Sequence, residues 1–75
     1  MITPAESKTA RKLLHWTQED VATRLLIAKS AVEKFEQKER LPWTLDLTKL
    51  RQLYEVAGVA FGKNEDDVRL KRKKR

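Results

Sequence analysis

The sequence predicts a small all-α domain. Among its 75 residues only 2 are glycine and 2 are proline, whereas the strong helix formers Leu, Lys, Glu, Arg and Ala are abundant. Apolar residues recur at helical spacing in several segments, and residues that favour the helix N-cap precede some of these segments. A chain of this length buries only about 60% of the surface that its unfolded form exposes, so we expect one domain with a compact core.

Two capping boxes mark the first two helices. Thr3 is followed by a proline and then by Glu6 three residues after the cap, and Thr17 is followed in the same way by Asp20. The boxes predict helices from about Pro4 to Leu14 and from about Gln18 to Leu25. The inward-facing residues would be Ala10, Leu13 and Leu14 in the first helix, and Val21, Ala22 and Leu25 in the second.

A third helix follows after a short interruption at Leu26 and Ile27. At about 100° per residue its side chains divide into two faces. One face is apolar and expected to be buried, and carries Ala28, Ala31, Val32 and Phe35. The other face is polar and exposed, and carries Lys29, Ser30, Glu33, Lys34 and Gln37.

The segment after this helix is expected to be a loop, followed by a fourth helix. Pro42 forbids helix through Leu41, which places a loop over Lys38 to Trp43. Thr44 can cap a helix that runs to about Ala57, before the natural left-handed stop at Gly58. The inward-facing residues of this helix would be Leu47, Leu50, Leu53 and Tyr54.

The end of the chain, residues 59–75, is expected to form an extension to a domain over residues 1–58. Two short apolar runs flank the turn-forming segment 62–67, which is consistent with a small β-hairpin or with an irregular end. Residues 69–75 hold six basic and no acidic residues, so the net charge of +6 lies in this tail and the rest of the chain has 11 basic and 11 acidic residues. Such a tail can be a solubilising end or an arm that contacts phosphates.

Composition also argues against several classes of protein. Cysteine is absent and His15 is the one histidine, which excludes disulfides, thiolate zinc sites and multi-histidine metal centres. No catalytic triad or glycine-rich phosphate loop is present, and the acidic run 65–67 lacks the spacing of a calcium loop. We therefore expect no enzyme activity and no cofactor. No apolar run approaches the roughly 18 residues of a membrane span, and we expect a soluble, cytoplasmic protein.

The second and third helices, joined by a minimal turn, form the arrangement with which many proteins read DNA. The major groove admits one α-helix, and each base pair shows a distinct pattern of donors and acceptors there. The polar face of the third helix meets this requirement. The alternative is a small helical bundle whose polar face is merely solvated.

The motif itself favours the first interpretation. The runs Thr17–Leu25 and Ser30–Glu36 resemble the XRE family of Cro-like and phage-repressor-like DNA-binding domains, over about residues 8–58. The resemblance implies a compact bundle of four or five helices containing a helix-turn-helix. It also implies sequence-specific binding to double-stranded DNA in transcriptional control, as a homodimer on a two-fold site and typically as a repressor.

The resemblance also implies roles for individual residues. Base reading would fall to Lys29, Ser30 and Lys34. Contacts to the DNA backbone would come from Thr17, Gln18, Lys38 and Arg40. Arg11 and Glu36 would form a structural ion pair that ties the first helix to the end of the third. Trp16 takes an aliphatic core position of the family, while Trp43 could pack against the last helix or form a dimer contact.

Two residues depart from the family pattern. Leu26 stands where the family usually has a glycine in the turn, and because a leucine resists the left-handed conformation we expect this turn to stay right-handed. Ala28 stands where a capping hydroxyl is usual, so the third helix should begin without a side-chain cap, at a cost of about 1 kcal/mol.

Two other functions are consistent with the same residues. An antitoxin would use this fold mainly to bind a toxin protein and would bind DNA for autoregulation. An RNA-binding basic peptide on a helical scaffold would depend on the tail and not on Lys29 or Lys34.

Overall fold

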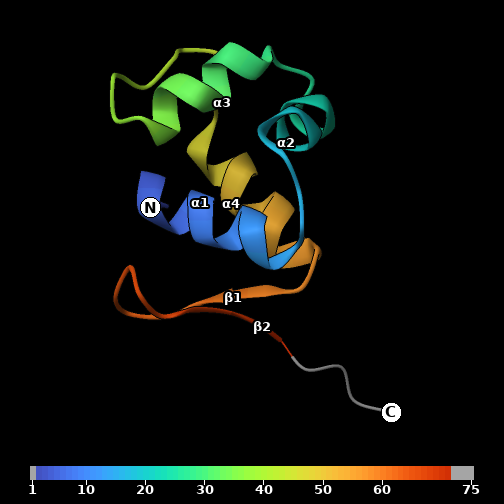
Figure 1. Ribbon diagram of the computed structural model, residues 1–75, viewed down its shortest axis with the longest axis vertical. Helices are drawn as coiled ribbons and strands as arrows, with labels where there is room; N and C mark the ends of the chain where they lie inside the picture. The colour runs from blue at the N-terminus through green and yellow to red at the C-terminus, as the bar shows by residue number, and fades with distance from the viewer. Residues whose placement is uncertain (1, 72–75) are drawn as a thin grey trace.

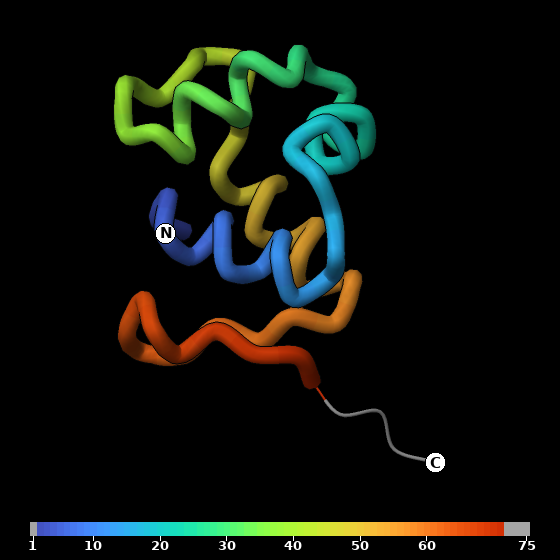
Figure 2. Tube along the Cα trace, viewed as in Figure 1, coloured from blue at the N-terminus to red at the C-terminus, as the bar shows by residue number. Residues whose placement is uncertain are grey.

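The computed structural model describes residues 2–71 and contains four helices followed by a β-hairpin (Figure 1). The elements are α1 (Pro4–Leu13), α2 (Gln18–Leu25), α3 (Lys29–Glu36), α4 (Leu47–Val56), β1 (Val59–Phe61) and β2 (Val68–Leu70). In Figures 1 and 2, α2 and α3 lie at one end of the molecule, α1 and α4 in the middle, and the hairpin at the other end. The expected helical bundle is confirmed, with four helices in the described part of the chain.

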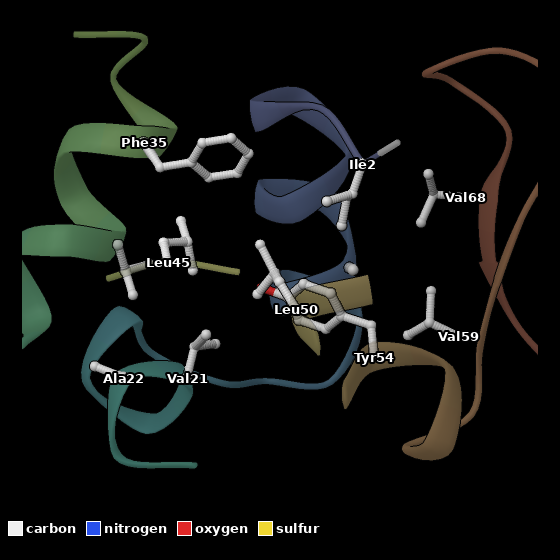
Figure 3. Packing of buried hydrophobic residues seen from close by; sticks show 11 residues of the cluster. Ile2, Val21, Ala22, Phe35, Leu45, Leu50, Tyr54, Val59 and Val68 are labelled. Atoms are coloured by element: carbon white, nitrogen blue, oxygen red, sulfur yellow. The ribbon is translucent and has the colours of Figure 1, made fainter. Parts of the chain in front are cut away.

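Two side chains of α4 lie at the centre of the hydrophobic core. Leu50 and Tyr54 of α4 are fully buried, and Figure 3 shows them between the side chains of α2 and α3 and those of the hairpin. Trp16 is half-buried against this core, as expected, and its ring stacks on Tyr54 with 6.1 Å between centroids. The buried apolar residues of the cluster are Ile2, Ala10, Val21, Ala22, Val32, Phe35, Leu45, Leu50, Tyr54, Val59 and Val68.

Both predicted capping boxes are confirmed. The Thr3 hydroxyl accepts from the backbone N–H of Glu6 at 3.1 Å, and the Glu6 carboxylate accepts from the backbone N–H of Thr3 at 2.9 Å. Thr17 and Asp20 make the same reciprocal pair at 3.0 and 2.8 Å. The hydrogen bond from the Thr17 N–H lowers the pKa of the Asp20 carboxyl. Each box satisfies N–H groups that the first turn of a helix leaves without partners.

The start of α4 corrects the prediction that Thr44 is its cap. The N-cap is Asp46, whose carboxylate accepts from the backbone N–H groups of Thr48 and Lys49 at 2.9 and 3.3 Å. A carboxylate is favoured over a hydroxyl at this position because it also meets the positive end of the helix dipole. The apolar Leu45 precedes the cap and is buried, with 4% of its surface exposed, which fixes the path of the chain into α4.

The hairpin exists because it packs on helices. Val59 of β1 and Val68 of β2 are buried against the core, which supplies the stabilisation that an isolated hairpin lacks. The strands pair antiparallel, with Val59 opposite Leu70 and Phe61 opposite Val68. Gly58 enters β1 with φ of 109°, which confirms its role as the stop after α4. Of the basic tail over residues 69–75, the last four residues lie outside the described residues.

Glu36 is the polar centre of the fold. Its side chain is fully buried, and its two oxygens accept four hydrogen bonds from three other side chains. Arg11 donates through Nη2 to Oε1 at 2.8 Å and through Nε to Oε2 at 3.1 Å, so the pair is bidentate. Ser7 Oγ donates to Oε2 at 2.8 Å, and Gln18 Nε2 donates to Oε1 at 3.1 Å. The end of α3 is thereby tied to α1 and to the start of α2.

Tyr54 extends this network to α4. Its hydroxyl lies 2.9 Å from Ser7 Oγ, and because the single proton of Ser7 is donated to Glu36, the tyrosine must donate to the serine. Burial, together with the nearby Glu36 charge, raises the pKa of Tyr54 to about 12. The phenol therefore keeps the proton that this hydrogen bond requires at any physiological pH.

The turn between α2 and α3 contradicts the expectation for Leu26. Leu26 is left-handed, with φ of 61° and ψ of 43°, and its side chain is 91% exposed. This conformation reverses the chain so that the backbone N–H of Ile27 reaches the Ala22 carbonyl at 3.0 Å while its side chain packs against the core. A right-handed Leu26 would continue α2 and lose that packing.

The strain at this turn gives the first prediction. Replacing Leu26 with glycine removes a left-handed penalty of about 1–2 kcal/mol and loses almost no packing, against an entropic cost of roughly 0.5–1 kcal/mol for glycine. We expect Leu26→Gly to raise the free energy of unfolding by up to about 1 kcal/mol in a urea titration. Leu26→Ala is the control, because alanine keeps the positive φ; a gain as large in Leu26→Ala would contradict the strain argument.

The hydrogen-bond network around Glu36 gives the second prediction. Glu36→Ala leaves the Arg11 guanidinium without a counter-charge, at an expected cost of about 3–5 kcal/mol. Since the whole domain should be stable by only about 4–11 kcal/mol, circular dichroism should show a largely unfolded or strongly destabilised protein. Glu33→Ala on the same helix removes a half-exposed carboxylate and should change stability by no more than about 0.5 kcal/mol. A Glu36→Ala protein as stable as the wild type would refute the role of the network.

Candidate nucleic-acid interface

Helix α3 divides into a buried face and an exposed face, as its sequence pattern predicts. The buried face carries Ala31, Val32, Phe35 and the anchoring Glu36. One expectation for this helix was wrong: Ala28 is exposed, because it is the N-cap residue in extended conformation and not part of the first turn. It makes no side-chain capping bond, in agreement with the sequence.

The three residues expected to read bases lie together on the outer side of α3. Lys29 and Ser30 are exposed in the first turn, and Lys34 follows one turn later, half-buried beside the next loop. The Lys29 ammonium lies 3.8 Å from the Glu33 carboxylate, an i,i+4 pair at the surface. Because such a pair is worth no more than about 0.5 kcal/mol, it screens the acidic charge of Glu33 without holding Lys29 away from another acceptor.

The two candidates at the start of α2 have structural tasks as well. The Thr17 hydroxyl is occupied by the capping box, while its residue remains exposed. Gln18 donates one of its two amide N–H groups to Glu36, which leaves the second N–H and the side-chain carbonyl oxygen for other partners. The same buried carboxylate that anchors α3 therefore also positions the Gln18 side chain.

Lys38 and Arg40 lie in the loop that follows α3, and both are exposed. Lys38 has φ of 63°, which ends the helix, and the next residue, Glu39, donates its backbone N–H to the Lys34 carbonyl at 3.0 Å. The loop then runs back along the helix, so that Arg40 and Lys34 border one open hollow of about 380 Å³. In Figure 2 this loop lies beside α3 at the end of the molecule away from the hairpin.

Sequence reasoning missed parts of this arrangement. Ser7 was assigned no role, although it lies one turn before Arg11 on α1 and could have been placed on the same helix face. Trp43 was expected to pack on α4 or to make a dimer contact, but in this chain it is 94% exposed and does not pack on α4. Arg24 covers the exposed side of Trp16, with its guanidinium carbon 4.2 Å from the ring centroid, a cation–π contact that no spacing rule predicts.

Over residues 2–71 there is no cluster of three or more side chains suited to holding a metal ion. Within the same residues, none of the helices has the length and apolar character needed to cross a membrane.

The comparison with protein families agrees with this geometry. A family model described as helix-turn-helix, HTH_3, matches residues 8–58, which include α2, the turn, α3 and α4 in full and most of α1. Neither the search of curated proteins nor the search of solved structures gave a match. The matched segment spans more than half of the chain and coincides with the segment whose residues resemble the XRE family. The chain therefore belongs to the HTH_3 family of XRE-type helix-turn-helix domains, which are DNA-binding regulators of transcription.

Proposed function

We propose that this protein is a sequence-specific regulator that inserts α3 into the major groove of a two-fold DNA site, as a homodimer, and acts as a repressor. The observation that carries the proposal is the division of α3. Its inner face is fixed by Phe35 and the bonded Glu36, while Lys29, Ser30 and Lys34 share a free outer face. A rigid helix with accessible donors on one side is what readout of base edges requires.

Lysine and serine at these positions favour a particular kind of site. The ammonium groups of Lys29 and Lys34 are donors, and the best acceptors in the major groove are O6 and N7 of guanine. We therefore infer a half-site that contains guanine. The carboxylate of Glu33, which lies between the two lysines in sequence, would be neutralised by Lys29 or would accept from the amino group of a cytosine.

The remaining candidates would hold the domain on the sugar–phosphate backbone. Thr17 and Gln18 stand at the N-terminus of α2, where free backbone N–H groups and the helix dipole favour an anion. Lys38 and Arg40 approach from the loop on the other side of α3. Contacts from both flanks would fix the depth and angle of the reading helix without contributing to sequence preference.

The proposed dimer predicts a definite spacing between the two half-sites. Two copies related by a two-fold axis would place their reading helices about one helical turn of DNA apart, near 34–36 Å. Selection of bound duplexes from a random pool tests both dimerisation and sequence-specific binding, because a dimer selects an inverted repeat with that half-site spacing. A single, asymmetric short motif would contradict the dimer, and the absence of any enriched motif would contradict sequence-specific binding.

Readout and positioning make different predictions for individual residues. Lys29→Ala and Lys34→Ala should each weaken binding to the selected site by about 1–3 kcal/mol and relax the preference at particular base pairs. Arg40→Ala should weaken binding to all sequences alike, because it removes a phosphate contact and not a base contact. Competition titrations with the selected site and with a scrambled duplex measure both effects. Equal losses on the two duplexes for Lys29→Ala would show that Lys29 is a phosphate ligand.

A further inference from the structure

The hollow between α3 and the following loop has a chemical character of its own. Its walls carry two cations, Lys34 and Arg40, and two hydroxyls, Ser30 and Thr44, while Trp43 and its apolar neighbours form one side. Every polar side chain that lines the hollow can donate a hydrogen bond, and none of the lining residues is a carboxylate. Its volume, about 380 Å³, is many times the roughly 30 Å³ that one water takes up in the liquid.

Trp43 is the unusual member of this set. With 94% of its surface exposed, it is a large apolar side chain that the fold leaves in water, although Leu45, two residues later, is buried in the core. The chain is held in this position on both sides, since the backbone N–H of Leu45 donates to the Pro42 carbonyl at 3.1 Å and Leu45 itself is buried. The indole is thus presented outward by an anchored segment, beside a concentration of positive charge.

Such a surface is complementary to an anion joined to an apolar unit. A backbone phosphate with its deoxyribose has this composition, because the phosphate oxygens accept hydrogen bonds and the carbon face of the sugar can lie on an aromatic ring. The hollow also opens beside the reading face of α3, since Ser30 and Lys34 belong to both. A duplex that receives α3 in its major groove brings its own backbone to this hollow.

We propose that the hollow holds one sugar–phosphate unit of each DNA half-site, with the phosphate on Arg40 and the sugar against the indole of Trp43. Thr44 would donate to the same phosphate, and the aliphatic stem of Lys34 would form the inner wall while its ammonium reaches the groove. This makes Trp43 a positioning residue that fixes how far α3 enters the groove. The inference rests on the proposed function, because the occupant belongs to the DNA that α3 reads.

The test compares Trp43→Ala with Val56→Ala on a selected operator and on scrambled duplexes. Val56 is the matched control, since it is also a large apolar residue, 87% exposed, but lies at the end of α4 next to the hairpin. Removing the contact of one indole face should weaken binding by roughly tenfold on every duplex and leave the preferred sequence unchanged. Val56→Ala should bind like the wild type.

Two further measurements locate the occupant. Operators in which single phosphates are replaced by neutral methylphosphonates should reveal one position per half-site that weakens the wild type but weakens Arg40→Ala no further. Iodide quenching should report Trp43, because the exposed indole is accessible in the free protein and should be protected on DNA. The Trp43→Ala protein, whose tryptophan fluorescence comes from Trp16 alone, supplies the background.

The outcomes separate this inference from the proposed function. If the wild type selects an operator but Trp43→Ala binds it equally well and iodide still reaches Trp43, the inference is overturned and the function stands. If the wild type binds no duplex, both are overturned. If Trp43→Ala binds weakly and sedimentation shows that it has lost a dimer that the wild type forms, the occupant is a second copy of the chain and the inference is likewise overturned.

Discussion

The buried carboxylate of Glu36 is the constraint on which this small domain depends. An ionised group with no access to water is tolerated only if hydrogen bonds replace its hydration, and here Arg11, Ser7 and Gln18 supply four of them. The donors come from α1 and from the first residue of α2, and Tyr54 of α4 joins through Ser7. All four helices are therefore oriented around one carboxylate at the end of α3.

This anchoring has a consequence for the proposed DNA recognition. Phe35 and Glu36 attach the C-terminal turn of α3 to the core, so the residues that face outward from its first turns are held on a fixed support. Gln18 couples the two halves of the motif directly, since it stands at the start of α2 and bonds to the end of α3. Under the proposed function, stability and recognition would be divided between the two faces of this eight-residue helix.

The sequence predicts most of the fold because its signals are local. The capping boxes at Thr3 and Thr17 specify helix starts through bonds within four residues, and apolar spacing specifies the inner faces. The errors arise where distant contacts decide. Leu26 adopts a left-handed conformation because Ile27 is required in the core, and α4 begins at Asp46 because burial of Leu45 fixes the preceding chain. Likewise, Ser7 hydrogen-bonds to both Glu36 and Tyr54, which lie far from it in sequence, so no local pattern identifies these partners.

A double-mutant cycle on Arg11 and Glu36 tests most directly whether this buried pair organises the fold. The free energy of unfolding would be measured for the wild type, Arg11→Met, Glu36→Leu and the double variant, with a stabilising osmolyte so that the single variants stay folded. Each single variant leaves a buried group unpaired, whereas the double variant removes both charges. If the pair organises the fold, the double variant is destabilised by at least about 2 kcal/mol less than the sum of the single effects. Effects that add to within about 0.5 kcal/mol would show that Arg11 and Glu36 act independently, and would contradict the claim that this pair organises the fold.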